Sequence, residues 1–361
     1  MKKIPQIIKS VFFGIFLVMN SCSNPDEEYS DAPLPVVVDL TQVPYPKLSD
    51  YHFFSGDLKN LSPSYGVIPY QPASELFTDY AEKKRFVWMP NDTKASYQND
   101  YTILNLPVGA VLIKVFYYNH VQPANTTKII ETRLMIRKST GWIFANYIWN
   151  DQQTEAFLTT QSTNRVISWT DTNNVIQTIN YRTPEVDFEC LRCHSRFNNE
   201  TIEPIGIKPQ NINHSFNYSD GLKNQLDKLI EVGYLEDNLP STIVSTVDFE
   251  DTSKTLNLRV RSYFDANCAH CHVDGGEAFI HNLRFAFNQT TDPRNMGVAT
   301  LADHYLEGYN NITVAPGNVA QSILHYRMNT EDDLLYIMPP IGRTKRHEEA
   351  VQLIETWINS L

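Results

Sequence analysis

The sequence predicts a mixed α+β chain in which a β-rich N-terminal domain is followed by an all-α C-terminal domain. Three observations support this fold class. Aromatic residues make up 12% of the 361 residues, which favours strands and apolar pockets. Segments rich in Val, Ile and aromatic residues recur before Arg182. Beyond Gly221, apolar residues instead recur with the spacing of amphipathic helices.

The β-rich region is expected to span residues 45–186. Leu104–Tyr118 is dense in Val, Ile and aromatic residues around a bend at Pro107-Val108-Gly109. Two hairpins are expected after it, the first from Ile129–Lys138 and Trp142–Trp149, the second from Val166–Trp169 and Val175–Tyr181. The second hairpin leads almost directly to Cys190.

Three helices are expected in the C-terminal half. Gly221–Val232 is amphipathic and is followed by Gly233, a common helix stop. A second helix, capped by Ser253, leads into Cys268. The third is Glu348–Leu361, with acids in its first turn. Its expected apolar face consists of Ala350, Ile354, Trp357, Ile358 and Leu361.

The N-terminus has the features of an export signal. Lys2, Lys3 and Lys9 precede a short apolar core, and Met19-Asn20-Ser21-Cys22 resembles the lipobox of bacterial lipoproteins. Residues 1–21 are therefore expected to be removed and Cys22 to be lipidated. Residues 22–44 are acidic and Pro-containing, which suits a tether to a membrane. The expected location is the cell envelope, with the outer membrane favoured and the periplasmic or surface face left open.

The overall charge argues against a polyanionic partner. The net charge is -11 and the pI is about 5.4, and removal of the three signal-peptide lysines makes the mature chain three charges more negative. Such a chain is not expected to bind nucleic acid.

Four of the five cysteines form two C-x-x-C-H motifs. The first motif is Cys190-Leu191-Arg192-Cys193-His194, and the second is Cys268-Ala269-His270-Cys271-His272. This pattern is the attachment signature of a c-type haem. Two thiols at this spacing can each form a thioether to the porphyrin, and the adjacent histidine can bind the iron. The sequence thus predicts two covalently bound haem c groups, with His194 and His272 as iron ligands.

Other interpretations of these cysteines remain open at this level. Exported proteins often form disulfides, and the two pairs could be two such bonds. They could also together bind zinc, although an oxidising compartment disfavours free thiolates. A thioredoxin-like pair is a third alternative, but no βαβ pattern lies nearby.

The sixth iron ligand is predicted for one of the two haems only. Met338 stands in Tyr336-Ile337-Met338-Pro339-Pro340, just before the last helix, and a thioether ligand raises the haem potential. Met328 is its competitor, in a segment with a helical pattern. For the first haem, His214 is the nearest downstream histidine. The other candidates are His120, His281, His304, His325 and His347. The alternative is a five-coordinate iron without a sixth ligand.

Longer segments resemble a family of two-haem lipoprotein c-type cytochromes of unassigned function. The segments that carry this resemblance are 46–51, 76–87, 131–134, 149–154, 204–206, 267–272 and 316–317. The resemblance implies a β-rich region at 45–186, a first haem-binding segment at 187–250 and a cytochrome c domain at 251–361. It implies haem iron at His194 and His272, and it supplies no substrate.

Three functions are compatible with these features. The favoured one is a membrane-anchored electron carrier that acts with unidentified redox partner proteins and does no chemistry alone. The second is a di-haem peroxidase or oxidase in which the first haem keeps an open position. The third is a ligand-binding β module coupled to a cytochrome c domain, with Trp142, Trp149 and Trp169 as candidate binding residues.

Overall fold

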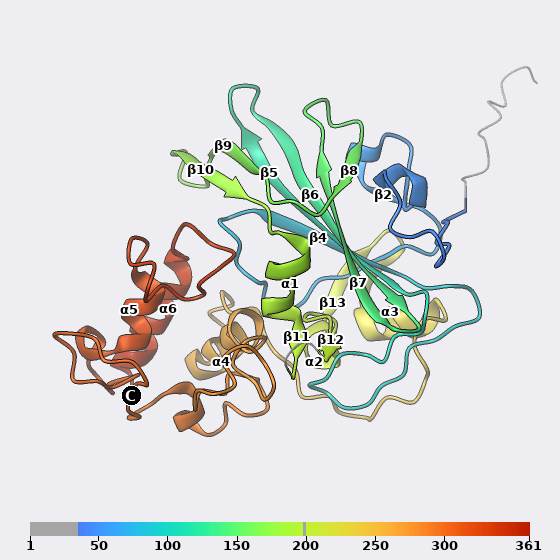
Figure 1. Cartoon of the computed structure of the whole chain (residues 1–361). Coiled ribbons are helices and arrows are strands. Elements are labelled where there is room, and N and C mark those ends of the chain that lie inside the picture. Colours follow the sequence, from blue (N-terminus) through green and yellow to red (C-terminus); the bar gives the residue numbers. More distant parts are fainter. Residues whose placement is uncertain (1–34, 198–199) are drawn as a thin grey trace, which may run out of the picture. The chain divides into compact units, whose positions relative to one another are not determined.

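The computed structural model describes residues 35–197 and 200–361. The expected signal peptide, Cys22 and most of the expected tether lie outside these residues. The mixed α+β class is confirmed, because a large antiparallel sheet occupies the N-terminal half and several helices the C-terminal part (Figure 1). Among the described residues, no helix combines the length and apolarity needed to cross a membrane.

The strands follow the chain in this order: β1 (Phe54–Ser55), β2 (Ser62–Pro63), β3 (Ile68–Pro69), β4 (Glu82–Trp88), β5 (Val111–Val121), β6 (Thr126–Lys138), β7 (Gly141–Trp149), β8 (Ala156–Thr159), β9 (Asn164–Thr170), β10 (Ile176–Arg182), β11 (Ser195–Arg196), β12 (Thr201–Ile202), β13 (Ser215–Tyr218) and β14 (Gly221–Asn224). Strands β3 to β10 form one eight-stranded sheet. Its central ladder is β4-β5-β6-β7-β8, and β9 joins β5 at the pair Val121↔Trp169.

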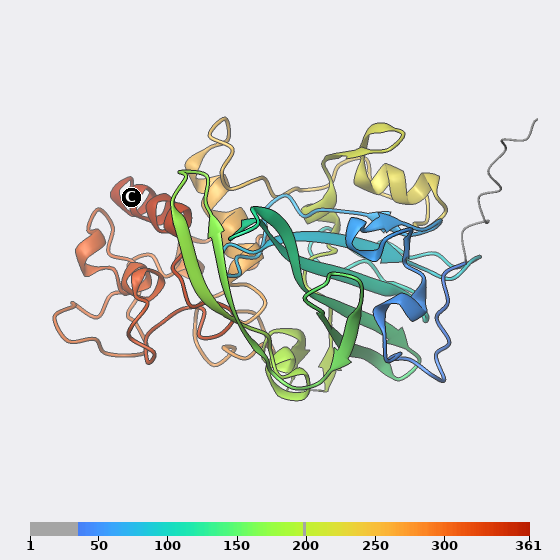
Figure 2. The same ribbon diagram turned by 90° about the horizontal axis from the view of Figure 1, so that it is seen from above.

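The α-helices are α1 (Val186–His194), α2 (Pro209–Ile212), α3 (Gln225–Glu231), α4 (Leu256–Asn267), α5 (Ile323–Asn329) and α6 (Glu348–Asn359). Short 3₁₀ turns are η1 (Leu48–Tyr51), η2 (Leu58–Asn60), η3 (Pro293–Met296) and η4 (Val319–Gln321). Helix α1 packs against β7, while α4 and α5 both pack against α6 (Figures 1 and 2).

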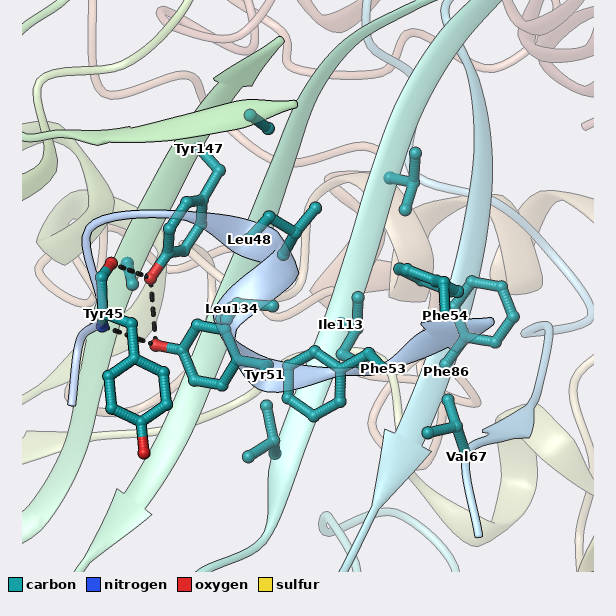
Figure 3. Close-up of a cluster of buried hydrophobic side chains, with 14 of the residues drawn as sticks. Tyr45, Leu48, Tyr51, Phe53, Phe54, Val67, Phe86, Ile113, Leu134 and Tyr147 are labelled. Atoms are coloured by element: carbon teal, nitrogen blue, oxygen red, sulfur yellow. Dashed lines mark hydrogen bonds between the residues drawn. The ribbon is translucent and has the colours of Figure 1, made fainter. Parts of the chain in front are cut away.

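Side chains alternate between the two faces of the sheet because a strand has a period of two. On one face, Phe86, Ile113 and Leu134 lie under the segment that carries η1 and β1 (Figure 3). This core includes a tyrosine network: the Tyr51 and Tyr147 hydroxyls are 2.9 Å apart, and the Tyr147 hydroxyl donates to the Tyr45 carbonyl at 2.8 Å. The segment that carries η1 and β1 covers this face of the sheet. Helix α1 packs on the opposite face.

Both predicted hairpins are confirmed. Strand β6 pairs with β7, and β9 pairs with β10. Strand β5 begins at Val111, after the predicted bend at Pro107–Gly109. Trp142, Trp149 and Trp169 are all buried in hydrophobic cores. Their burial favours the core interpretation over a ligand-binding surface.

The predicted helix over 221–232 is wrong in its first turn. Residues 221–224 form β14, which pairs with β13, and α3 begins only at Gln225. The Asn224 side chain accepts a hydrogen bond from the Leu226 amide at 2.9 Å and so caps α3. Leu222, assigned to the apolar face of the helix, is 71% exposed.

The two helices around the second motif are confirmed with changes at their ends. Thr255, not Ser253, caps α4: its hydroxyl accepts from the Leu258 amide at 3.4 Å. Helix α6 starts at Glu348 as predicted but ends at Asn359. Leu361 therefore lies beyond the helix and is 43% exposed, because the last turn has already left the packed face.

Candidate functional site

Helix α1 carries the whole first motif. It starts four residues after β10 ends, so the sheet fixes where it begins. Asp187 and Glu189 lie in its first turn, where negative charge is favoured, and the Glu189 carboxylate accepts from the Glu185 amide at 2.8 Å. Cys190, Cys193 and His194 therefore project from one short helix that packs against β7.

The second motif follows the end of α4 as a single turn. The amides of Cys271 and His272 donate to the Cys268 carbonyl, at 3.2 and 3.0 Å. Helix α4 is held in place because Val260 and Phe264 are fully buried against α6. The turn thus brings both thiols and His272 to the end of the helical core.

The two motif histidines are half-buried. Burial is the main cause that lowers the pKa of each to about 4. The Nδ1 of His194 donates to the Glu203 carbonyl at 2.8 Å, an arrangement that leaves Nε2 for a metal. The Nδ1 of His272 is buried without a hydrogen-bond partner among the described residues. Both imidazole rings are therefore suited to bind a metal ion in their neutral form.

The two motifs contact each other directly. The ligand atoms of Cys193, His270 and Cys271 lie within 4.8 Å of one another. An ion pair reinforces this contact: Arg192 of the first motif lies 2.6 Å from Glu277, which follows the second motif. The Phe197 amide also donates to the Gly275 carbonyl at 2.8 Å.

Gly275 is required where the two motif regions approach each other. Its φ of +75° is unfavourable for other residues, and a Cβ there would lie 2.7 Å from the Phe197 ring. Any side chain at position 275 would therefore be strained and would displace the exposed Phe197 ring.

The second motif lines a cavity of about 640 Å³, here called the second cavity. Cys268, Cys271 and His272 line it together with Met338 and Met328. Two hydrogen bonds fix the backbone of Met338. Its amide donates to the Arg327 carbonyl at 2.8 Å, and its carbonyl accepts from the Arg343 side chain at 3.1 Å. Met328 belongs to the packed core around α5 and α6. Both methionines therefore reach the cavity, and Met338 lies on a loop outside that core.

The first motif lines a separate cavity of about 450 Å³, here called the first cavity. Its walls come from α1, from β4 to β7, and from the loops 76–79, 204–206 and 339–344. Both cavity volumes fall within the roughly 300–1,000 Å³ of small-molecule and cofactor sites. The first motif thus lines one cofactor-sized space. The second motif lines both, because His270 and Cys271 border the first cavity as well as the second.

The six histidines considered for the first iron do not line the first cavity in the described structure. His281, His304 and His347 line the second cavity instead. His214 is bonded to Gln71 and Gln225, and His325 is bonded to Glu355. His120 is exposed on β5. Folding the chain therefore takes these side chains away from His194, which the sequence could not indicate.

One loop is shared by the two cavities. Pro339, Pro340 and Arg343 line both of them. The loop is anchored by the buried Asp79, whose carboxylate accepts from the amide of Lys345 and from the amide and hydroxyl of Thr344, at 2.6–3.0 Å. The β-rich half therefore positions the loop that carries Met338.

The donor set fits two covalently attached haem groups. All four motif cysteines are free thiols in the structure. Burial raises the pKa of Cys190 to about 11 and that of Cys268 to about 12, which keeps these thiols protonated. The cluster of Cys193, His270 and Cys271 offers three ligand atoms, one fewer than a structural zinc site uses.

Sequence reasoning missed a polar wall of the first cavity. Arg85, Lys114, Arg133 and Asn146 all line it. The available signal was Lys114, a single charge inside the otherwise apolar run from Val108 to Tyr118. A lone charge at an inward strand position requires a partner when the strand is buried.

Comparison of the sequence with protein-family models and with curated proteins, and of the fold with solved structures, finds no match.

Proposed function

We propose that the chain is an exported, membrane-anchored di-haem c-type cytochrome that transfers electrons to and from partner redox proteins. The observation that carries the proposal is the pair of C-x-x-C-H motifs, which contact each other and whose histidines His194 and His272 line two different cofactor-sized cavities. Haem c bound at these motifs would supply one one-electron iron couple in each cavity. Lipidation at Cys22 and location in the cell envelope are part of the proposal.

The chain's own residues would hold and tune these groups. His194 and His272 would provide the proximal nitrogens, with the Glu203 carbonyl orienting the His194 ring. Met338 would provide the sixth ligand of the second haem and raise its potential. The contact of Cys193 with Cys271 would place one attachment thiol of each haem next to the other, which would favour electron exchange between the two groups.

The experiment is a haem count combined with spin state, on mature protein made in a host that exports it and attaches haem. Two covalent haems, both low-spin, are expected. A single haem, or zinc bound in place of haem, would overturn the proposal. A Cys22→Ser variant is expected to leave the membrane fraction, while the wild type stays in it.

An enzyme with an open first iron is the second candidate, and one observation favours it. None of the six candidate distal histidines lines the first cavity in the described structure, whereas polar side chains do. A high-spin first haem and rapid reduction of hydrogen peroxide with a reduced donor would favour this peroxidase-type function over the carrier.

A further inference from the structure

Four polar side chains form a row across the wall of the first cavity. Arg85 on β4 is paired with Lys114 on β5, Lys114 with Arg133 on β6, and Arg133 with Asn146 on β7. Residues paired in this way share one face of the sheet. All four line the first cavity, together with Cys190 and His194. We call this set the cationic row.

The positive charges of the row are incompletely compensated. Like charges placed opposite each other on neighbouring strands destabilise a sheet. Arg85 forms an ion pair with Glu75 at 3.1 Å, and Arg133 forms one with the buried Glu131. The Lys114 ammonium has no hydrogen bond or ion pair with any described residue and lies 4.8 Å from the centre of the Phe116 ring. Burial, reinforced by Arg85 and Arg133, holds its pKa well below the usual value.

Several donors of the row are also without acceptors. Asn146 is 2% exposed, and neither its Nδ2 nor its Oδ1 has a hydrogen-bond partner among the described residues. The Nε of Arg133 is buried and unpartnered as well. Buried donors normally find an acceptor, so this wall requires one. Lysine and arginine donors match the oxygens of carboxylates and oxyanions.

We propose that the cationic row binds a carboxylate or a small oxyanion inside the first cavity. Two sources share this chemistry, namely a propionate of the first haem and a soluble anion. The proposal rests on the proposed function, because it concerns the haem-loaded protein. The anion would favour the charged form of Lys114 and give Asn146 Nδ2 and Arg133 Nε the acceptor atoms that they lack.

The test compares Lys114→Gln with Lys84→Gln in mature protein whose haem content has first been shown to be two. Lys84 is the matched control, because it lies on β4 next to Arg85 but is exposed and belongs to the other face of the sheet. Asn146→Leu is a second test variant that removes donors without removing a charge. Circular dichroism checks that each variant is folded.

In the first arm, the protein is titrated with formate and with sulfate. Binding is measured by calorimetry and by changes in the visible absorption spectrum. If a soluble anion is bound, the wild type and Lys84→Gln take up one equivalent with the same Kd. Lys114→Gln then binds at least about ten-fold more weakly, and Asn146→Leu is also weakened. Lys114→Arg should restore most of the affinity, because it keeps the charge.

The second arm measures the potential of the first haem against pH. If the anion is a propionate, neither added anion binds, and the pH-dependent step in the potential moves to higher pH in Lys114→Gln. The reason is that a carboxylate without its cation is easier to protonate. Lys84→Gln should leave that step unchanged.

Two results would overturn the proposal. One is the absence of anion binding together with an unchanged pH-dependent step in both Lys114→Gln and Asn146→Leu. The other is loss of a low-spin signature in Lys114→Gln alone, which would make Lys114 an iron ligand. A haem count below two contradicts the proposed function itself, and that measurement precedes both arms.

Discussion

The two cavities present the same motif to two different surroundings. The second cavity is built mainly from residues 263–351, with α4, α5 and α6 around it. The first cavity combines α1 with strands and loops between residues 70 and 344. The helical surroundings offer methionine and histidine side chains, whereas the sheet offers the cationic row. The motif therefore fixes the proximal side of each site, and the neighbouring fold decides the opposite side.

This difference implies unequal haem potentials under the proposed function. A methionine opposite His272 would favour Fe(II) and raise the potential of the second haem. The first haem would instead have a potential set by buried charges and by the bound anion. Two neighbouring haems of unequal potential would favour electron transfer from the haem of lower potential to the haem of higher potential.

The largest expected effect comes from removing one pair of cysteines. The double variant Cys190→Ala/Cys193→Ala should lose one of the two haems, because these two cysteines line the first cavity whereas Cys268 and His272 line the second. Haem per chain is measured by intact mass and by haemochrome absorbance. The matched variant Cys268→Ala/Cys271→Ala should lose the other haem. Loss of both haems from either variant would show that the two sites do not load independently.

The next largest effect concerns the two methionines of the second cavity. Met338→Ala should lower the potential of one haem by on the order of 0.1 V, because axial ligands tune haem potentials over about 0.8 V. Met328→Ala should keep both potentials but lower the free energy of unfolding by about 2–5 kcal/mol, since Met328 belongs to the buried core. Redox titration and urea unfolding separate the two roles. Unchanged potentials in Met338→Ala would remove it as a ligand.

A smaller effect concerns the second cavity, which is lined by a histidine outside the two motifs. His347 lines the second cavity and stacks on Phe77 with ring centroids 4.2 Å apart. Burial lowers its pKa to about 3, against about 6.5 in an unfolded chain. Between these values the unfolded chain binds more protons. The free energy of unfolding should therefore fall as the pH falls, with His347 contributing about 1.4 kcal/mol per pH unit.

Urea unfolding between pH 7 and pH 4 measures this slope. His347→Phe keeps an aromatic ring on Phe77 and should flatten the slope. His304→Phe is the control, because it replaces an exposed histidine of the same cavity. An equal slope in the wild type and His347→Phe would show that folding does not lower the pKa of His347.

The smallest effect concerns the helix that leads into the second motif. Thr255→Ala should lower the free energy of unfolding by about 0.5–2 kcal/mol, because the Thr255 hydroxyl caps α4. Ser253→Ala should have no comparable effect, because its side chain does not cap the helix. Thermal unfolding of the two variants compares them directly. A larger destabilisation by Ser253→Ala than by Thr255→Ala would show that Ser253 caps the helix.

The sequence predicted elements whose signals are local. Both hairpins and the apolar face of α6 followed from alternation and helical spacing, except that Leu361 lay beyond the helix. The strand at 221–224 was missed because its pairing with β13 outweighed a helical pattern of four residues. The cap of α4 shifted by two residues because Ser253 and Thr255 are both good caps, and only the backbone selects between them.

The chemistry of the motifs was determined by the sequence itself, because two thiols and a histidine at fixed spacing need only one turn of backbone. Tertiary structure alone decided what faces each motif. The contact of Cys193 with Cys271 joins residues 78 positions apart, and the row of Arg85, Lys114, Arg133 and Asn146 depends on strand register. Register is set by packing across the whole sheet, so no local pattern contains it.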